Sequence, residues 1–341
     1  MMTQTMRAAV FEGEGRLGIR EVDVPRVGAP DDVLLAVRAA GICGTDVHIL
    51  AVPPGHPATA GVVMGHEYAA DVLAVGDRVD HVHPGDRVVV DPSVWCGTCA
   101  YCQMGLTNLC DRMTGIGIFR HGGFAPFSLV PARAVYRIAA SVAPETAALA
   151  EPLADVVNGL SKVHVVPGES ALVLGAGPIG LLFTLLLRAA GVSPLLVAEV
   201  SSFRAGHAAA CGADLIINPK DVDLAAAVRR ATVLGADVVV DAVGMLLEDA
   251  LRCVRKGGRV LLFGMHEHAR PAVKQYDITK YEIQILGTYI ARGTFPLAIR
   301  LLEAGRIDFG ALVTHRLPLT RIHDGVDLLR QGQAVKVAIL P

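Results

Sequence analysis

The chain has 341 residues, of which 52% are hydrophobic and 19% charged, with a formal net charge of -2 and a pI near 6.6. These values suit a well-buried protein of one large or two medium domains, and the lack of a basic block argues against nucleic acid or an anionic membrane as a partner. Every long apolar stretch is interrupted by Gly, Pro or a charged residue, so we expect no transmembrane span. The first residues lack the apolar segment of a signal peptide, so we expect a cytoplasmic protein with reduced thiols.

The first half of the chain predicts short strands, because apolar runs such as 33–37 and 87–90 are bounded by turn signals. From about Ala143 the pattern changes, and apolar runs alternate with segments of helical periodicity. The runs are 171–174, 195–198, 238–240 and 260–263, and the helical segments include 181–190 and 203–211. Alternating strands and helices predict βαβ units and a parallel sheet.

After Ala291, a helical pattern at 297–304 and a closing strand at 334–340 return to the style of the first half. The predicted fold class is therefore α/β, with a nucleotide-binding unit inserted into a β-rich unit that uses both chain ends. The predicted boundaries are residues 1–153 and 291–341 for the β-rich catalytic domain, and 154–290 for a Rossmann domain with a doubly wound parallel sheet.

Four of the seven cysteines fall in one short stretch of the β-rich half, at Cys96, Cys99, Cys102 and Cys110. CxxCxxC followed by a fourth cysteine can surround a tetrahedral Zn²⁺ with four thiolates. Disulfides are the alternative, but a reducing compartment favours metal binding. We therefore predict a structural Zn²⁺, which stabilises a loop and leaves the chemistry to other residues.

A glycine-rich segment follows the strand predicted at 171–174 and precedes a helical pattern, which is the context that the GxGxxG motif requires. The cofactor-binding residues predicted in it are Gly175, Gly177, Pro178, Ile179 and Gly180. A dinucleotide pyrophosphate binds at the N-terminus of such a helix.

Glu199 ends the next predicted strand, at the distance where a carboxylate accepts hydrogen bonds from the ribose hydroxyls. Because a carboxylate repels a 2′-phosphate, Glu199 favours NAD over NADP. Arg204 lies five residues further on and is expected to stack on adenine; if it turned to a 2′-phosphate, this preference would weaken.

A catalytic zinc needs about three protein ligands and one open position. Cys43 in a tight loop offers a thiolate, and His66-Glu67 offers an imidazole beside a carboxylate. The order of Cys43, His66-Glu67, the cysteine cluster and the Gly175 motif resembles the zinc-dependent medium-chain dehydrogenase/reductase family over essentially the whole chain. Glu151-Pro152-Leu153 is more similar to the sorbitol (polyol) and threonine dehydrogenase branches than to the primary-alcohol branch.

The resemblance implies a GroES-like catalytic domain in which Cys43, His66 and either Glu67 or Glu151 bind a catalytic Zn²⁺, a Lewis acid that lowers the pKa of a bound hydroxyl. It also implies a proton relay from Thr45 through the nicotinamide ribose toward His48. The contacts it implies on the nicotinamide side of the cofactor are Val243, Phe263, Gly264, Met265, Thr288 and Tyr289.

The expected reaction is NAD-linked oxidation of a secondary alcohol to a ketone, the substrate being a polyol, sugar alcohol, cyclitol or aminocyclitol. Ile49 and Ile290 stand where sorbitol-type enzymes carry an aromatic residue and an arginine, so the substrate remains open. An amino alcohol such as L-threonine is the alternative, and a catalytically silent binding or structural protein is a third interpretation. The resemblance also implies a homodimer or homotetramer, for which the apolar segment 283–286 offers an edge strand.

Overall fold

The computed structural model describes residues 4–341, so the first three residues of the stretch considered above for a signal peptide lie outside it. The chain divides into two compact units. Unit 1 comprises residues up to Ala154 together with Ala291–Pro341, and unit 2 is Asp155–Ile290. The first boundary lies one residue beyond the position expected from the sequence. Within residues 4–341, no helix is both long and apolar enough to cross a membrane.

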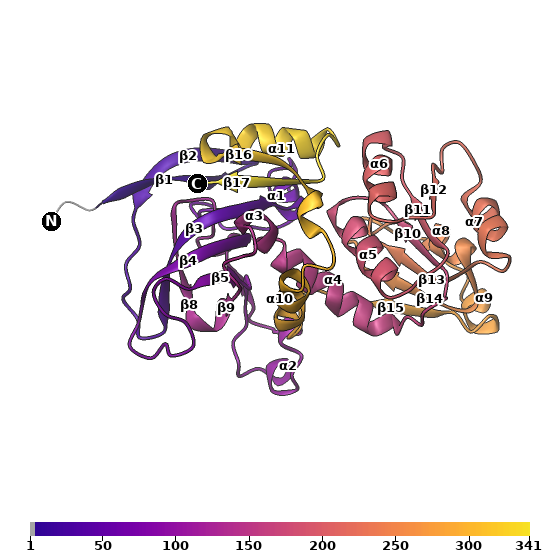
Figure 1. Cartoon of the computed structure of the whole chain (residues 1–341), viewed down its shortest axis with the longest axis horizontal. Helices are drawn as coiled ribbons and strands as arrows, with labels where there is room; N and C mark the ends of the chain where they lie inside the picture. Colours follow the sequence, from indigo (N-terminus) through magenta and orange to yellow (C-terminus); the bar gives the residue numbers. More distant parts are fainter. Residues whose placement is uncertain (1–3) are drawn as a thin grey trace. The chain divides into compact units, whose positions relative to one another are not determined.

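Unit 1 is built around a seven-stranded sheet in which β17, β3, β4 and β5 are neighbours and β8 pairs with β3 (Figure 1). Its strands are β1 (Thr5–Gly13), β2 (Arg16–Asp23), β3 (Asp32–Ile42), β4 (Glu67–Val75), β5 (Arg87–Val90), β6 (Ser93–Val94), β7 (Thr114–Gly115), β8 (Phe127–Pro131), β9 (Val135–Arg137), β16 (Val313–Pro318) and β17 (Lys336–Leu340). Its helices are α1 (Gly44–Ile49), α2 (Ala100–Gln103), α3 (Pro144–Ala147), α10 (Phe295–Glu303) and α11 (Ile322–Arg330), and α4 (Ala150–Val163) contains the boundary with unit 2.

The C-terminal strand completes the sheet of unit 1. β17 pairs antiparallel with β3, so residues near Val337 lie beside residues near Ile42, almost 300 positions earlier in the chain. On its other side β3 pairs antiparallel with β4, which places Gly41 opposite Glu67. This register brings three distant segments together at the end of β3, where α1 begins.

Unit 2 is a six-stranded parallel sheet in the order β12-β11-β10-β13-β14-β15, the doubly wound arrangement expected from the sequence (Figure 1). Its strands are β10 (Ala171–Leu174), β11 (Leu195–Ala198), β12 (Leu215–Ile217), β13 (Ala236–Asp241), β14 (Val254–Leu262) and β15 (Gln284–Gly287). Its helices are α5 (Pro178–Ala189), α6 (Ser202–Ala210), α7 (Leu224–Thr232), α8 (Leu247–Cys253) and α9 (Gln275–Lys280).

The strands of this sheet are mostly uninterrupted apolar runs in the sequence, because helices cover both faces of the sheet. Leu172 and Leu174 belong to one apolar cluster with residues of α7 and α8, whereas Val173 between them points to the opposite face and is equally buried. α5 packs on β10 and β11. The strand order reverses between β10 and β13, and in such sheets ligands bind at the carboxyl ends of the strands near this switch point.

Candidate metal and cofactor sites

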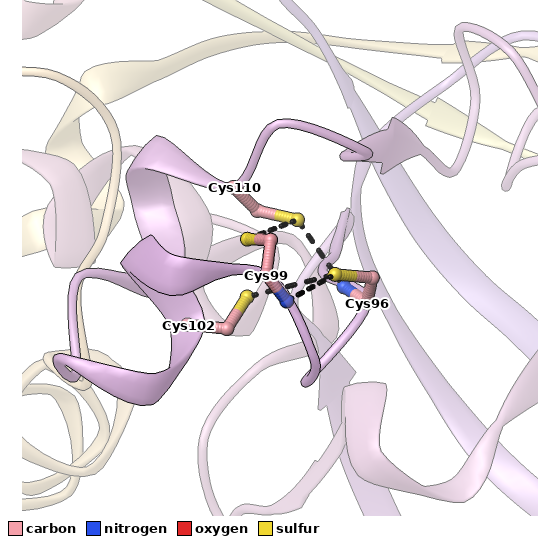
Figure 2. A group of neighbouring side chains, drawn as sticks. All are labelled: Cys96, Cys99, Cys102 and Cys110. Carbon is pink, nitrogen blue, oxygen red and sulfur yellow. Dashed lines mark hydrogen bonds between the residues drawn. The ribbon is translucent and has the colours of Figure 1, made fainter.

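The four clustered cysteines converge on one point (Figure 2). Their sulfur atoms all lie within 4.8 Å of one another, and Cys96 Sγ is 4.0 Å from Cys102 Sγ and Cys99 Sγ 3.9 Å from Cys110 Sγ. Zn–S bonds of about 2.3 Å in a tetrahedron require sulfurs about 3.8 Å apart. None of the chain's seven cysteines is in a disulfide, so this donor set fits a structural Zn²⁺.

Backbone amides donate to the sulfur atoms of two of these cysteines. The N–H groups of Thr98 and Cys99 donate to Cys96 Sγ at 3.4 and 3.3 Å, and the N–H of Arg112 donates to Cys110 Sγ at 3.3 Å. The hydrogen bond from Thr98 lowers the pKa of the Cys96 thiol to about 5. The Arg112 guanidinium, 3.5 Å from Cys96 Sγ, adds a positive charge beside the cluster. These contacts favour the thiolate at Cys96, whereas burial raises the pKa of the Cys102 thiol to about 12, so a metal would have to displace the proton of Cys102.

A second donor group lies at the end of β3 in unit 1. Cys43, His66 and Glu67 each offer a ligand atom within 4.8 Å of the others. His66 and Glu67 are buried, with 3% and 1% of their surface exposed, and Cys43 is half-buried. Thiolate, imidazole and carboxylate together are a donor set that Zn²⁺ accepts.

Asp46 connects the thiolate and imidazole ligands. Its Oδ2 accepts the N–H of Cys43 at 2.8 Å, which caps the start of α1, and its Oδ1 lies 3.5 Å from His66 Nδ1. Both Asp46 Oδ1 and His66 Nδ1 are buried without a hydrogen-bond partner. A metal on the other nitrogen of His66 would fix the tautomer that donates from Nδ1 to Asp46, so these two atoms fit a metal-bound histidine.

The protonation of the ligands responds to the same neighbours. Burial, followed by the negative charge of Glu67, raises the pKa of the Cys43 thiol. Burial opposes protonation of His66, but the Asp46 carboxylate outweighs it and raises the pKa of His66 well above its usual value. Both groups therefore hold a proton that metal binding would displace.

Glu67 has a buried partner that the sequence analysis missed. Lys336, at the start of β17, donates from Nζ to Glu67 Oε1 at 2.8 Å and to Oε2 at 2.6 Å. Burial favours the neutral amine, but the charges of Glu67, Cys43 and Glu151 outweigh it and raise the pKa of Lys336. Lys336 lies 269 positions from Glu67 in sequence, and only the pairing of β17 with β3 brings it close.

The remaining residues predicted for catalysis lie near these elements. Thr45 and His48 are three residues apart on α1 and share a face of the helix, Thr45 half-buried and His48 exposed. Glu151 lies in the first turn of α4 and is half-buried. Its carboxylate does not belong to the group within 4.8 Å formed by Cys43, His66 and Glu67.

In unit 2, the glycine-rich segment forms the turn between β10 and α5. Gly177 caps α5, Pro178 occupies its first turn, and Ile179 and Gly180 continue it. A Cβ on Gly180 would lie 1.8 Å from the Gly175 carbonyl oxygen, whereas a Cβ on Gly177 would meet nothing within 4 Å. Gly180 thus allows close packing, and Gly177 leaves open space at a helix N-terminus, which fits a pyrophosphate.

Glu199 lies after β11 with 7% of its surface exposed. Oε2 accepts the N–H of Ala176 in the glycine-rich turn at 2.7 Å, and Oε1 accepts the N–H groups of Val200 and Ser201 at 2.8 Å. A carboxylate offers about four acceptor sites, so it retains capacity for a ribose hydroxyl. Arg204, in the first turn of α6, has a buried Nε without a hydrogen-bond partner.

The loops predicted for the nicotinamide side also lie at strand ends of unit 2. Asp241 at the end of β13 accepts the N–H groups of Val243, Gly244 and Leu246 at 2.8–2.9 Å. A Cβ on Gly264 would lie 2.3 Å from Gly244 N, so the loops after β13 and β14 touch through their backbones. The predicted residues on these loops are the exposed Val243 and Met265 and the half-buried Phe263 and Gly264.

Asn158, on α4, holds the loop after β15. Its Nδ2 lies 3.3 Å from Thr288 Oγ1 and the Tyr289 carbonyl oxygen and donates to the Ile290 carbonyl oxygen at 2.6 Å. Ile290 has a φ of +33°, which a β-branched residue rarely adopts. The roles of Asn158 and Asp46 were not predicted from the sequence; the one available signal was the capping position of Asp46, three residues after Cys43.

Two family descriptions match the chain: residues 29–140 match the alcohol dehydrogenase GroES-like domain, and residues 178–304 match zinc-binding dehydrogenase. A D-altritol 5-dehydrogenase of Agrobacterium fabrum is 37% identical over 329 residues, 93% of this chain and 94% of the relative. An L-threonine 3-dehydrogenase of Anaeromyxobacter sp. is 33% identical over 96% of both chains. Among solved structures, a zinc-binding dehydrogenase of Sinorhizobium meliloti bound to NADP has a TM-score of 0.94 and 32% identity, covering 99% of this chain and 100% of that chain.

Proposed function

Because the chain belongs to the zinc-dependent medium-chain dehydrogenase family, we propose that it oxidises a secondary alcohol of a polyol or related compound to a ketone while reducing NAD. Family membership confirms the predicted combination of a GroES-like domain and a Rossmann domain. The observation that carries the proposal is the convergence of Cys43, His66 and Glu67 in unit 1, a donor set suited to a catalytic metal.

Cys43 and His66, with a carboxylate from Glu67 or Glu151, would hold the catalytic Zn²⁺, and the four clustered cysteines the structural one. When bound at the first site, Zn²⁺ supplies a Lewis acid that makes a hydroxyl group more acidic. Asp46 orients His66 and stabilises the loop that carries Cys43.

Thr45 and His48 are the residues proposed to move the alcohol proton. Thr45 lies two residues after Cys43, and its hydroxyl would accept the substrate proton while giving up its own proton, through the nicotinamide ribose hydroxyl, toward His48. His48 is exposed on the same face of α1 and can pass the proton to solvent. This arrangement separates proton removal, carried by α1, from hydride transfer to the cofactor.

For the cofactor, the glycine-rich turn would bind the pyrophosphate and Glu199 the adenosine ribose. Glu199 supports NAD over NADP, because its fixed carboxylate would repel a 2′-phosphate. The residues proposed to contact the nicotinamide half are Val243, Phe263, Gly264, Met265, Thr288 and Tyr289.

The proposed substrate class is supported by two similar relatives. D-altritol 5-dehydrogenase acts on a sugar alcohol, which favours a polyol with several hydroxyl groups. L-threonine is the second candidate, because an L-threonine 3-dehydrogenase matches 96% of this chain at 33% identity, against 93% at 37% for the D-altritol enzyme.

We also propose that the protein functions in a reducing, cytoplasmic compartment as a homodimer or homotetramer. The first point is supported by the seven cysteines, none of which is in a disulfide. β15 supports the second, because it is an edge strand of the sheet in unit 2 and could pair with the same strand of a second copy.

The direct test is reduction of NAD by the zinc-loaded protein with D-altritol, other polyols, cyclitols and L-threonine. We expect turnover with at least one polyol and its loss in Cys43→Ser. An enzyme specific for L-threonine would move the substrate assignment to the second candidate. Equal turnover by Cys43→Ser would contradict the metal-dependent mechanism.

A further inference from the structure

One buried amide in unit 2 holds the whole loop that follows the last strand of the sheet. Asn158, on α4, has 2% of its surface exposed, and its Nδ2 donates to the Ile290 carbonyl oxygen at 2.6 Å. The same nitrogen lies 3.3 Å from the Tyr289 carbonyl oxygen and from Thr288 Oγ1. The three residues after β15 thus share one donor, and two of them accept through the main chain.

The packing of α4 explains how Asn158 reaches this loop. The next residue is Gly159, where a Cβ would lie 3.3 Å from Leu261 Cδ2 and from Phe263 Cδ2. A glycine at this position therefore lets α4 approach the carboxyl end of β14 closely. One turn further along the helix, Lys162 Nζ donates to the Gly287 carbonyl oxygen at 2.9 Å. Two side chains on one face of α4 thus bind the end of β15 and the loop after it.

The backbone of Ile290 needs this support. Its φ of +33° lies in the left-handed region, which is unfavourable for a β-branched residue. Such strain persists only where the surrounding structure holds the backbone in place. The shortest of the three Asn158 contacts is the one to the Ile290 carbonyl oxygen. Asn158 is therefore placed to stabilise the strained conformation directly.

The same contacts orient the other side of the loop. In a trans peptide group the C=O and the N–H point in opposite directions. The Tyr289 carbonyl faces Asn158, so the N–H of Ile290 points away from α4. Thr288 and Tyr289 are among the residues proposed above to contact the nicotinamide half of the cofactor. A binding loop keeps its geometry only when supporting hydrogen bonds fix its backbone.

We propose that Asn158 is a positioning residue for the nicotinamide half of the cofactor, because its amide keeps Ile290 left-handed and thereby fixes the loop of Thr288 and Tyr289. This inference rests on the proposed cofactor site and adds a residue that acts through this loop. The glycine-rich turn follows β10, which β13 and β14 separate from β15. Loss of Asn158 should therefore weaken binding of the nicotinamide half and spare the adenosine half.

The test compares NADH with ADP-ribose, which carries the adenosine and the pyrophosphate but no nicotinamide. Calorimetry measures both Kd values, so no turnover is needed. Asn158→Ala removes the donor, Asn158→Asp keeps the shape but replaces the donor with an acceptor, and Ile290→Gly is made with and without Asn158→Ala. The control is Ser170→Ala, which removes a buried hydrogen bond of 2.6 Å to Asp237 at the amino end of β10 in the same unit.

We expect Asn158→Ala and Asn158→Asp to raise the Kd for NADH about tenfold or more and to leave the Kd for ADP-ribose within about threefold of wild type. Retained ADP-ribose binding shows that each variant is folded. Ser170→Ala should lower Tm and leave both Kd values within about threefold. Because glycine adopts a positive φ without strain, adding Asn158→Ala to Ile290→Gly should raise the Kd for NADH by about threefold at most.

An unchanged Kd for NADH in Asn158→Ala would overturn the inference. Equal weakening of NADH and ADP-ribose would do the same, because it would show a general loss of structure in unit 2. A full tenfold loss in the Ile290→Gly background would contradict the role given to the strain at Ile290. These results leave the proposed cofactor site intact, because wild-type protein still binds NADH. Wild-type protein that binds neither ligand would contradict that site, and the inference with it.

Discussion

At the scale of single residues, backbone amides orient the carboxylates that matter most in unit 2. Glu199 and Asp241 each accept three N–H groups, and both are buried. A carboxylate held in this way can direct its remaining acceptor capacity at one place only. Glu199 therefore combines two roles: it connects the end of β11 to the glycine-rich turn, and it presents a negative charge to the ribose.

Replacing Glu199 with Ala should relax the preference for NAD. Removal of a fixed negative charge beside the 2′-position should raise the ratio of kcat/KM for NADP to that for NAD by about tenfold or more, equivalent to about 1.4 kcal/mol. Asp223→Ala, which removes the N-cap of α7, is the control for stability loss in the same unit. Asp223→Ala should lower Tm without changing the ratio of kcat/KM for NADP to that for NAD. If Glu199→Ala also leaves this ratio unchanged, Glu199 does not select the cofactor.

Asp91 should make stability depend on pH. Burial raises its pKa to about 6, against the opposing hydrogen bond from the Ser93 N–H at 2.9 Å. The pKa of Asp91 is thus higher in the folded protein than its value of about 3.9 in the unfolded chain. The folded state therefore loses stability as the pH rises from about 3.9 to about 6, and above pH 7 the total loss is about 2–3 kcal/mol. Asp91→Asn keeps the acceptor oxygen without the charge, so its Tm should exceed wild type at pH 7.5 and the gain should be about half as large at pH 5.

Replacing Asp71 with Asn should change the stability in the opposite direction to Asp91→Asn. Although burial opposes ionisation of Asp71, Arg87 and Arg38 lower its pKa. Its contribution to stability is therefore present at neutral pH and lost as pH falls through the folded pKa. Asp71→Asn should lower Tm at pH 7.5. For the Asp91→Asn variant described above, a gain in Tm of the same size at pH 5 and pH 7.5 would show that the Asp91 carboxyl is not the titrating group.

At the scale of elements, the position of His66 depends on closely packed glycines. A Cβ on Gly117 or Gly122 would lie 2.3 or 2.1 Å from the carbonyl oxygen of Gly65, which itself has a φ of +93°. The N–H of Gly123 donates to that same oxygen at 2.8 Å. The segment before β4 is therefore held by backbone contact, and His66 follows it directly.

Gly122→Ala should displace this segment and weaken the metal site beside it. We expect a loss of about 1–3 kcal/mol in stability from overpacking, and a lower metal content at the Cys43 site with an intact cysteine cluster. Gly206→Ala, in α6 with nothing within 4 Å of the added Cβ, should leave stability equal or slightly higher. Full metal content and unchanged Tm in Gly122→Ala would contradict this packing role.

Most elements of unit 2 that flank the cofactor motif were predicted from the sequence, and two elements of the unit were not. β10 and β11 lie at the expected residues, and α5 and α6 differ from the predicted helices by a few residues at their ends. Neither β12, which has three residues, nor α7, which has nine like α6, was predicted from the sequence. These elements depend on the sheet already formed by their neighbours, which local sequence does not report.

At the scale of the whole molecule, the two ends of the chain belong to one unit. Motifs in consecutive residues, such as the cysteine cluster and the glycine-rich turn, were recognisable because ligand spacing is a local property. Lys336 was not, because its role depends on the pairing of β17 with β3. The same pairing places a C-terminal residue beside the ligands of a site whose motifs lie in the first 70 residues.

The most direct test of metal-dependent hydride transfer is to measure whether deuterium moves from the alcohol carbon to NAD in a single turnover. The zinc-loaded protein is mixed with NAD and D-altritol deuterated at its carbinol carbons, and the reduced cofactor is analysed by mass spectrometry. We predict reduced cofactor that carries one deuterium, a primary isotope effect where hydride transfer limits the rate, and no product from Cys43→Ser. If D-altritol is not oxidised, the same measurement uses the polyol found in the substrate panel. Reduced cofactor without deuterium, or the same yield from Cys43→Ser, would contradict metal-dependent hydride transfer from a secondary alcohol.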